Sequence, residues 1–460
     1  MAHLENENIK SSAVILGANT FAEEVCAASA RISTTRGTAL QIFEKSKTAE
    51  NNRTLIFKVL SSGHKSLIEH YMFNLAFNNV SVFVEQFVIE FRLASFTVQS
   101  RRYVDFGDAG FYTPDGLTAA QAELYAENME SLFASYKNLT EAGVPKEDAR
   151  FVLPYCLRSN FYCACNAREF LHIVCSMVYG RGKYDPELYA LGMELKGQFD
   201  ALLPGVIEKE RPKYERRADD RYSENNGALA ASAPPRPVPK PAPRKFAAEL
   251  LSATARPAEI LSKTPSFNYA KNGAAVPLAE ILKTERPREL ELLNYTFAVR
   301  DISLAAITHV ARHRMQTLLI PHIQNAVAAG RYIMPESVKS NEAALKIYTG
   351  AFERNHESLT RLRGIGFPPE LCVYFALSGN TLDILIHMNA RELAHFFNLR
   401  TCRRAQWEIR DIACAMLKLL RREDKELFSD FGPSCLLYRK CPEGRMSCGK
   451  FDEVVKQFTV

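Results

Sequence analysis

The sequence feature that most constrains this chain is a long internal repeat. Residues 143–168, GVPKEDARFVLPYCLRSNFYCACNAR, align without a gap with residues 366–391, GFPPELCVYFALSGNTLDILIHMNAR. Each segment begins with Gly-x-Pro and ends with Asn-Ala-Arg, and a histidine follows at the same spacing, as His172 and His395. A repeat of this length indicates an internal duplication, so we expect two like domains related by a pseudo-twofold axis.

The composition changes between the two copies. Residues 224–245, ENNGALAASAPPRPVPKPAPRK, are rich in proline and alanine and contain little to bury. This composition is typical of an extended linker of the polyproline type, and a docking site for a peptide-binding partner is the alternative interpretation. The predicted domains are a first repeat at 1–215, a Pro/Ala-rich linker at 216–246 and a second repeat at 247–460.

Both helical and strand patterns occur within the repeats. Residues 71–77 alternate well enough for a strand. The segments expected to be helical are 21–32, 38–60, 81–91, 119–142, 165–179 and 302–310. Gly143 is expected to end the helix that precedes it, and Pro145 to start the next one.

Charge and hydropathy restrict the partners of the chain. Lys and Arg number 58 against 52 Asp and Glu, and a net charge of +6 over 460 residues gives little support to a nucleic-acid partner. The same charge is compatible with a phosphorylated small substrate. No apolar run approaches the roughly 20 residues of a membrane span, and the polar start MAHLENENIKSS has no apolar signal core. We therefore expect a cytoplasmic protein with no membrane partner.

The eleven cysteines are scattered, which suits reduced thiols better than a disulfide framework. Only Cys435, Cys441 and Cys448 form a cluster, and its gaps are wider than those of a zinc finger, with no second pair. We therefore expect no metal site, and the role of this cluster stays open. The sequence also lacks a glycine-rich dinucleotide fingerprint, a phosphate-loop lysine motif and a nucleophile elbow.

Two basic stretches are candidates for binding phosphate. Arg312, His313 and Arg314 stand at the end of an apolar segment, and arginine forks match phosphate oxygens in two places at once. In the first repeat Ser100 and Arg102 are two residues apart, and in extended backbone they lie on one face, which suits a terminal phosphate. The alternative for the triplet is a solvated helix end, and for Ser100 and Arg102 a surface turn.

Other basic residues raise the question of their partners. Arg150 has apolar neighbours in DARFVLP, so it needs either a ligand anion or a carboxylate such as Glu147 or Asp148. The run NARELAHFFNLR at 389–400 contains two arginines and a histidine that can project toward one cleft. A lone histidine such as His64 is more often a core or surface residue than a ligand.

Taken together, these motifs resemble the flavin-dependent thymidylate synthases, and both halves do so independently. That family carries Arg-His-Arg, seven residues, then Ser-x-Arg-Tyr, and further on a run similar to VNARSLxxFLxLR…AQWEI. The second half has Arg312–Arg314 and NARELAHFFNLR…AQWEIR at 389–410. The first half has FRLASFTVQSRRY at 91–103, GVPKEDARFVLP at 143–154 and NAREFLH at 166–172. The chain is identified as a tandem and partly degenerate member of this family.

The resemblance implies a mixed α/β (α+β) fold for each repeat, a reaction, an assembly and a set of site residues. It implies methylation of dUMP to dTMP with methylenetetrahydrofolate and with FAD that NADPH reduces. It implies sites between subunits of a homotetramer, so that two tandem chains form a pseudo-tetramer. It implies that Arg400 polarises the uracil and that the nucleotide is bound by Ser100, Arg102, Tyr103 and Arg150. The residues it implies for FAD are His64, Arg92, Asn166, Arg168, His172, Arg312, His313, Arg314, Asn389, Arg391 and His395.

The departures from the family pattern are complementary. The first half has Glu90–Phe91 in place of the leading Arg-His and Met177 in place of the polarising arginine. The second half has His322 and Gln324 in place of the Ser and Arg, and Val373 in place of the nucleotide-contacting arginine. We therefore expect hybrid sites that combine unlike halves, half as many per assembly as the family has. The alternatives are a degenerate member that binds flavin or a pyrimidine nucleotide without synthase activity and, with least support, a nucleic-acid-binding protein.

Overall fold

The computed structural model describes residues 10–216, 238–242, 248–268 and 278–459. The chain divides into two compact units, which we call unit 1 (Met1–Val238 with Glu336–Leu377) and unit 2 (Pro239–Pro335 with Ser378–Val460). Unit 1 therefore contains the first repeat together with a segment of the second. The predicted domain boundaries follow the sequence repeat and stay a prediction. Most of the predicted linker, 216–246, lies outside the described residues.

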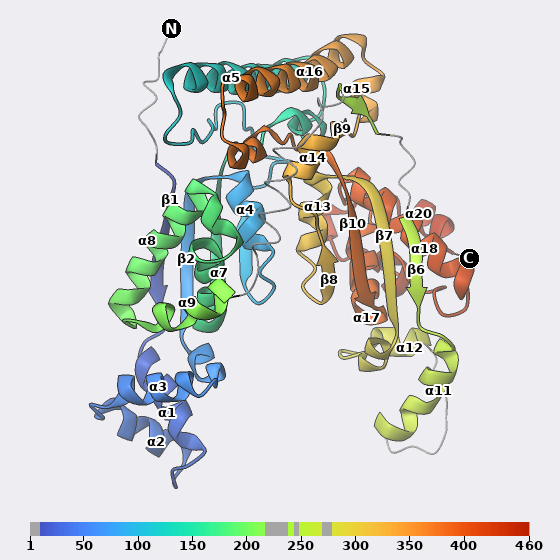
Figure 1. The fold of residues 1–460 in the computed structure, drawn as a ribbon. Coiled ribbons are helices and arrows are strands. Elements are labelled where there is room, and N and C mark those ends of the chain that lie inside the picture. The colour runs from blue at the N-terminus through green and yellow to red at the C-terminus, as the bar shows by residue number, and fades with distance from the viewer. Residues whose placement is uncertain (1–9, 217–237, 243–247, 269–277, 460) are drawn as a thin grey trace. The chain divides into compact units, whose positions relative to one another are not determined.

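The sheet of unit 1 has four antiparallel strands in the order β1-β2-β4-β3 (Figure 1). These strands are β1 (Ser12–Ala18), β2 (Met72–Ser81), β3 (Ser95–Val98) and β4 (Arg158–Asn166). Phe77 of β2 lies opposite Phe161 of β4, and their stacked rings, with centroids 4.5 Å apart, form part of the buried core. Such cross-strand aromatic pairs fix the register because a one-residue slip would turn both rings to the other face.

The sheet of unit 2 repeats this topology as β6-β7-β10-β8. Its strands are β6 (Ala248–Ala253), β7 (Asn294–Ser303), β8 (Gln316–Leu319) and β10 (Thr381–Asn389). The register shifts near one end of β2 and of β7, and a left-handed residue lies there in each, Asn79 at φ 50° and Asp301 at φ 53°. Asn and Asp tolerate this conformation better than most residues. The prediction of a mixed helix-and-sheet fold is confirmed.

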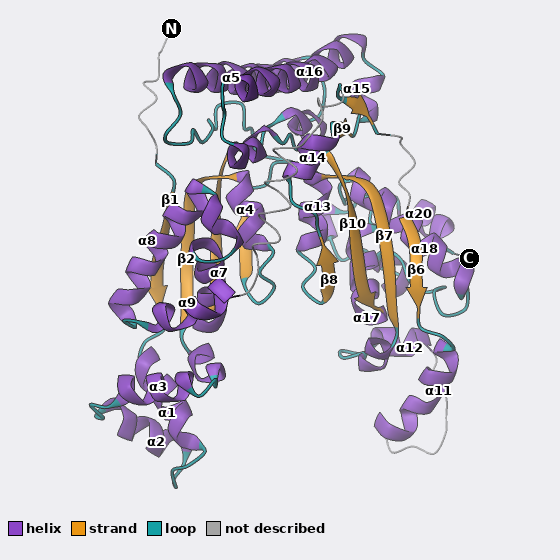
Figure 2. Ribbon diagram, in the orientation of Figure 1, coloured by secondary structure: helices purple, strands orange, loops and turns teal. Residues whose placement is uncertain are grey.

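Helices pack on both sheets and connect their strands (Figure 2). In each unit two long helices contact the sheet, α7 and α8 in unit 1 and α17 and α18 in unit 2. None of the helices in the described ranges combines the length and apolar character needed to cross a membrane.

The helices of unit 1 are α1 (Ala22–Ile32), α2 (Ala39–Lys47), α3 (Asn52–Ser61), η1 (Lys65–His70), α4 (Val82–Ile89), α5 (Ala119–Glu141), α6 (Lys146–Ala149), η2 (Arg150–Val152), α7 (Ala167–Val178), η3 (Arg181–Tyr184), α8 (Pro186–Leu202), α9 (Val206–Arg216), α15 (Glu336–Lys339), α16 (Glu342–Gly364) and η5 (Pro369–Phe375). Those of unit 2 are α11 (Pro257–Asn268), α12 (Leu278–Lys283), η4 (Arg288–Leu292), α13 (Leu304–Ala311), α14 (Gln324–Ala329), α17 (Ala390–Arg400), α18 (Trp407–Glu423), α19 (Ser434–Tyr438), η6 (Gly444–Met446) and α20 (Phe451–Phe458).

Three helical predictions need correction. The helix predicted at 302–310 begins only at Leu304, because Ile302 and Ser303 still belong to β7. The segment 38–60 is broken into α2 and α3, and an Ala-Glu-Asn turn near residue 50 separates them. The helix predicted at 165–179 begins only at Ala167, because Cys165 and Asn166 still belong to β4. Asn166 caps that helix by accepting a hydrogen bond from the Glu169 backbone N–H at 2.9 Å. A short polar side chain at this position satisfies a backbone donor that the helix itself leaves open.

Helix α16 of the second repeat packs along α5 of the first within unit 1 (Figure 1). The Asn128 side-chain amide donates to the Asn355 side-chain oxygen at 3.0 Å, and Asn355 donates to the Phe375 carbonyl at 2.9 Å. Both asparagines are buried. This pair of buried, hydrogen-bonded amides specifies the helix register because any slip would leave polar groups without partners.

The linker contributes one short strand to unit 2. β5 (Lys240–Pro241) pairs in parallel with β9 (Arg331–Tyr332). The Lys240 N–H donates to the Gly330 carbonyl at 3.0 Å, and the Ala242 N–H to the Tyr332 carbonyl at 2.8 Å. The described end of the linker is therefore attached to unit 2 by backbone hydrogen bonds.

A buried carboxylate lies at the start of α4 and another at the start of α13. In unit 2 the Glu408 carboxylate accepts from the Ser303 backbone N–H at 2.7 Å and from its hydroxyl at 2.5 Å. In unit 1 the Glu187 carboxylate accepts from the Ser81 backbone N–H at 2.8 Å. Each serine also caps its helix, so each carboxylate fixes the point at which the chain leaves the second strand and enters the helix.

Asp185 adds a second buried carboxylate in unit 1. It caps α8 by accepting from the Leu188 backbone N–H at 2.9 Å. The Tyr374 hydroxyl lies 3.2 Å from an Asp185 oxygen and 3.2 Å from a Glu187 oxygen. Burial raises the pKa of Asp185 to about 7, and the neighbouring Glu187 adds to the rise.

We predict that Asp185 makes unit 1 less stable as the pH rises. Because the folded-state pKa is about 7 against an ordinary value of 3.8, its favourable contribution is complete below pH 4 and is lost toward pH 7. Asp185→Asn keeps the cap and removes the ionisation. Between those pH values the wild type should lose on the order of 2–4 kcal/mol of unfolding free energy relative to the variant, measured by denaturant titration. The exposed Asp115→Asn controls for the loss of a charge, and parallel profiles for wild type and Asp185→Asn would contradict the prediction.

Candidate active site

The second repeat contains a hydrogen-bonded chain of three side chains, Glu392–His313–Arg400. His313 is only 3% exposed. Its Nδ1 lies 2.9 Å from Glu392 Oε1, and its Nε2 lies 3.0 Å from Arg400 Nε. Because arginine Nε always carries a hydrogen, it donates to Nε2, which leaves the histidine proton on Nδ1 to face the carboxylate. The imidazole is therefore neutral and links a carboxylate to a guanidinium.

The surroundings of His313 keep it in that neutral form. Burial lowers the pKa of His313, and the Arg400 charge lowers it further, while the hydrogen bond to Glu392 opposes both effects. A neutral imidazole at this position accepts from Arg400 without repelling it. The chain of contacts thus fixes the orientation of one guanidinium.

Two helices bring these three residues together. Helix α13 ends just before Arg312, so the triplet Arg312–Arg314 lies at its C-terminal end with His313 turned inward. Helix α17 supplies both Glu392 near its start and Arg400 at its end. The outer members of the triplet, Arg312 and Arg314, are exposed. His395 is also exposed, and its ring centroid lies 5.5 Å from that of His313.

The first repeat has lost the same chain of contacts. Phe91 occupies the position of His313 and Met177 that of Arg400, while Glu169 remains in place of Glu392. Met177 is fully buried, and the Phe91 ring meets the His172 ring edge-on with centroids 4.9 Å apart. Phe91 and Met177 therefore replace two residues that are hydrogen-bonded to each other in the second repeat, His313 and Arg400.

A cavity of about 460 Å³ lies beside Phe91 in unit 1. Among its lining residues are Arg92 and His172, both predicted to bind the cofactor, and Arg181. Arg181 forms an ion pair with Glu90 at 2.7 Å and lies over the Phe87 ring. The first repeat thus keeps a pocket with charges of both signs at this place, without the histidine–arginine pair.

The nucleotide-binding candidates of the first repeat gather around Glu147. The side chain of Arg102 forms an ion pair with the Glu147 carboxylate, and Arg150 Nε donates to the Glu147 carbonyl at 3.0 Å. Arg150 is buried as expected, but its carboxylate neighbour Asp148 instead accepts from Ser337 Oγ at 2.5 Å.

Ser100 and Arg102 do not lie in extended backbone, so that expectation was wrong. Residues 101–103 form a turn, and the Tyr103 N–H donates to the Ser100 carbonyl at 3.2 Å. Within this turn the Arg102 backbone N–H donates to Ser100 Oγ at 3.4 Å. Tyr103 is exposed and lies under the Arg102 guanidinium, 5.4 Å from its ring centroid. The backbone at residues 101–103 is therefore a turn, which was the alternative interpretation of this segment.

The second repeat keeps one hydrogen bond of this turn with other side chains, although Gln324 there begins helix α14. The Gln324 backbone N–H donates to His322 Nδ1 at 3.3 Å, as Arg102 does to Ser100. Val373, at the position of Arg150, is buried. The cationic group on this turn is therefore confined to the first repeat.

The Asn-Ala-Arg motifs have the same structural role in both repeats. Asn389 caps α17, as Asn166 caps α7, by accepting a backbone N–H at 2.9 Å. Arg168 pairs with Glu69 at 2.6 Å and Arg391 with Glu291 at 2.5 Å; each acid lies on the short helix before the second strand. Arg391 therefore does not share the surroundings of Arg400. His64 is exposed just before η1, the helix that carries Glu69.

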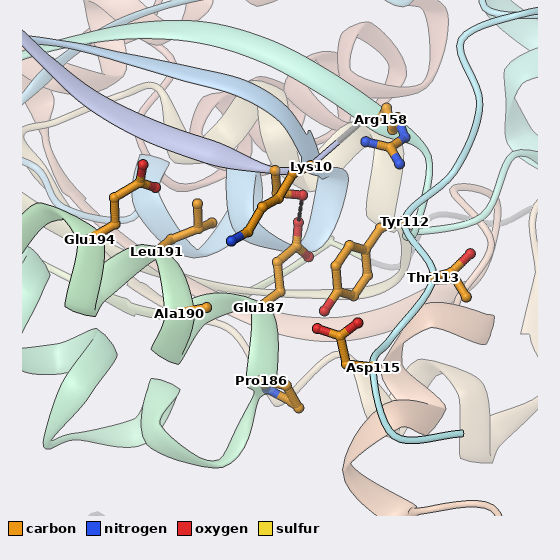
Figure 3. Close-up of a pocket in the computed structure, with 11 residues that line it drawn as sticks. Lys10, Tyr112, Thr113, Asp115, Arg158, Pro186, Glu187, Ala190, Leu191 and Glu194 are labelled. Atoms are coloured by element: carbon orange, nitrogen blue, oxygen red, sulfur yellow. Dashed lines mark hydrogen bonds between the residues drawn. The ribbon is translucent and has the colours of Figure 1, made fainter. Parts of the chain in front are cut away.

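Unit 1 contains a further polar cavity of about 540 Å³ that the sequence did not indicate (Figure 3). Lys10, Tyr112 and Arg158 line it together with Glu187, which accepts from Ser11 Oγ at 2.9 Å. Arg158 is held by backbone carbonyls, with Nε 3.2 Å from that of Phe111. None of the predicted site residues lines this cavity, whose walls carry charges of both signs.

Two acids of the site were missed by sequence reasoning. Glu392 holds His313, and Glu147 holds Arg102. Glu392 lies three residues after an asparagine cap, a spacing that by itself indicates a helix start rather than a partner for a distant histidine. Glu147 had been considered only as a partner of Arg150.

Comparisons with known proteins agree with the duplicated organisation. The family model described as thymidylate synthase complementing protein matches residues 15–204 and again 246–424. The flavin-dependent thymidylate synthase of Geobacter sulfurreducens is 35% identical over 184 residues, covering 39% of this chain and 79% of that protein. The enzyme of the same name from Clostridium tetani is 28% identical over 239 residues, covering 45% of this chain and 95% of its own.

Among solved structures, a UMP/dUMP methylase, PolB from Streptomyces cacaoi, aligns with 44% of this chain and 94% of its own at 20% identity. Its TM-score of 0.36 is too low to carry an argument about function. The two-segment match of the family model covers most of the chain, once in each repeat. The chain therefore belongs to the family of thymidylate synthase complementing proteins, as a tandem duplication.

Proposed function

We propose that the chain methylates dUMP to dTMP, using methylenetetrahydrofolate as the carbon donor and FAD reduced by NADPH. The observation that carries this proposal is the Glu392–His313–Arg400 chain, which orients one arginine through a buried neutral histidine. A guanidinium held in this way suits the stabilisation of negative charge on a uracil ring whose carbon 5 acts as the nucleophile toward the carbon donor. Membership of the family and the names of its relatives support the same reaction.

The residues around His313 fit a flavin dinucleotide. Arg312 and Arg314 are both exposed at the end of α13, and two guanidinium forks match the charge of a diphosphate. His395, exposed beside the His313 ring, adds a polar side chain next to them. When bound, the reduced flavin supplies the electrons that convert a transferred methylene into a methyl group.

The first repeat supplies the clamp for the nucleotide phosphate. Ser100, Arg102 and Arg150 lie on one turn and one short helix around Glu147. The Glu147 carboxylate now neutralises Arg102, and a phosphate, with more charge and more acceptor oxygens, competes for the same guanidinium. Tyr103 lies beneath Arg102 and limits its freedom to move.

Each working site takes its clamp from a first repeat and its flavin-facing arginines from a second. The division follows from what each half has lost, since the first has Phe91 and Met177 and the second has His322, Gln324 and Val373. Two tandem chains then supply the four domains of the family's assembly, with half the family's number of sites.

A degenerate member that binds flavin or a pyrimidine nucleotide without making thymidylate is the second candidate. The ion pair between Arg102 and Glu147 favours it, because a structural carboxylate on that arginine weakens the phosphate clamp. Retained FAD without dTMP formation and without complementation of a thymidine auxotroph would establish this second candidate.

The proposal predicts a yellow protein that forms dTMP. The purified chain, given dUMP, methylenetetrahydrofolate and NADPH, should bind FAD and yield dTMP detectable by chromatography. Omission of any one of the three small molecules is the control, since each should be required. A colourless protein that takes up no FAD on titration would refute the proposal.

Replacement of His313 tests the role of the buried histidine. His313→Phe reproduces the first repeat and removes the acceptor of Arg400, so we predict a fall in kcat of tenfold or more, the loss of a charge-assisted bond of about 1.5–3 kcal/mol. His313→Gln keeps an acceptor oxygen and should retain more of the activity. Steady-state kinetics and thermal unfolding of both variants separate this effect from a loss of folding. Equal rates for the two variants would contradict a role in holding Arg400.

A further inference from the structure

The polar cavity of unit 1 is enclosed by three parts of the first repeat and by Arg158 of β4 (Figure 3). The three parts are the chain just before β1 at Lys10 and Ser11, the loop residues 112–115, and the first turns of α8. Its volume of about 540 Å³ lies in the range of clefts that bind small molecules, roughly 300–1,000 Å³. The cavity is therefore large enough for a small organic ligand.

Three of the five charged side chains in the walls are already bound by the protein itself. The Glu187 carboxylate, only 2% exposed, accepts from Ser11 Oγ at 2.9 Å. The Glu194 carboxylate accepts from the Ala13 backbone N–H at 2.9 Å. The half-buried Arg158 guanidinium donates to two backbone carbonyls, at 3.2 and 3.3 Å. These three charged groups fix the walls of the cavity.

Three further polar groups in the walls belong to Lys10, Asp115 and Tyr112. Among the residues that the structure describes, the side chains of Lys10 and Asp115 form no ion pair or hydrogen bond, and neither does the Tyr112 hydroxyl. Burial raises the pKa of Tyr112, so the hydroxyl keeps its proton at neutral pH. Figure 3 shows Lys10 and Asp115 on opposite sides of Glu187. The cavity thus presents one ammonium and one carboxylate that are available to a ligand.

The backbone holds Tyr112 in place before any ligand binds. Its N–H donates to the Cys156 carbonyl at 2.8 Å, and its carbonyl accepts from the Tyr125 hydroxyl at 2.8 Å. The Tyr112 ring also packs against the Tyr374 ring, with centroids 5.2 Å apart. A side chain fixed in this way loses little conformational entropy when it contacts a ligand.

The second repeat forms the same backbone frame without these polar groups. The Ile333 N–H donates to a backbone carbonyl at 2.9 Å, in the same way as the Tyr112 N–H. In the aligned segments Thr381 takes the position of Arg158. Ile333 and Thr381 are both buried. Because the frame requires neither a tyrosine nor an arginine at these two positions, a ligand explains their presence in the first repeat better than the fold does.

We propose that this cavity binds a small zwitterion with the chemistry of an α-amino acid. The ligand carboxylate pairs with Lys10, the ligand ammonium pairs with Asp115, and the Tyr112 hydroxyl is a further acceptor for the ammonium. Carboxylates outnumber cationic side chains in the walls by three to two, which disfavours a phosphate or a nucleotide. This inference does not depend on the proposed synthase activity.

The test is calorimetric titration of the full chain with each standard L-amino acid, with dUMP and FAD both present in excess. We expect at least one amino acid to bind with one site per chain. Its methyl ester, which lacks the carboxylate charge, and its N-acetyl derivative, which lacks the ammonium, should each bind about tenfold more weakly or worse. If no amino acid binds, or if the ester binds as tightly as the parent zwitterion, the proposal is overturned.

Side-chain replacements then locate the bound amino acid. Lys10→Met and Asp115→Asn should each weaken its binding by about tenfold or more, because each removes one of the two charge partners. Both residues are exposed, so thermal unfolding without ligand should be unchanged. Lys58→Met is the matched control, because Lys58 is exposed on α3 and does not line the cavity. Unchanged affinity in both cavity variants would place the amino acid elsewhere and contradict the proposal.

Discussion

A buried carboxylate at the turn from strand to helix sets the geometry of both halves. Glu408 binds the backbone and hydroxyl of Ser303, and Glu187 binds the backbone of Ser81. An ionised group away from water is costly unless it is hydrogen-bonded, so these contacts allow few other arrangements of the turn. The helix that starts there is about two turns long and ends at Ile89 or Ala311, directly before residues 90–92 or 312–314. The position of the arginine–histidine triplet thus depends on an acid far away in the sequence.

The two repeats share this frame and differ in the side chains mounted on it. In the second repeat Glu392, His313 and Arg400 form a continuous polar chain. In the first repeat, phenylalanine and methionine take the last two positions, and the pocket beside them is lined by both acidic and basic side chains. If one member of such a chain is replaced, the buried polar groups of the other members lose a hydrogen-bond partner. Replacing the histidine and the arginine together by apolar residues is therefore less costly than replacing only one of them.

Much of the fold could be predicted from the sequence, because it rests on local patterns. The repeat, the helices and the mixed sheet follow from periodicity and from glycine, proline and asparagine signals. The packing of residues 336–377 with the first repeat could not be predicted. The two repeats have similar helical patterns, and such patterns do not indicate which repeat a helix packs against. The sequence left both an extended segment and a surface turn open at 101–103, because a Ser-x-Arg spacing fits either one.

The site was predicted as residue types rather than as contacts. Arg400 and His313 were both named, but the bond between them depends on α13 and α17 meeting in space. Long-range pairs of this kind leave no periodic trace in a single sequence.

The central claim is that unlike repeats serve one site, and a double-mutant cycle on Arg102 and Arg400 tests it most directly. The quantity to measure is the loss of turnover in Arg102→Ala, Arg400→Ala and the double variant. If both arginines act on one bound nucleotide, each single change should abolish most of the activity and the double change should cost little more. Independent losses that multiply in the double variant would contradict a shared site.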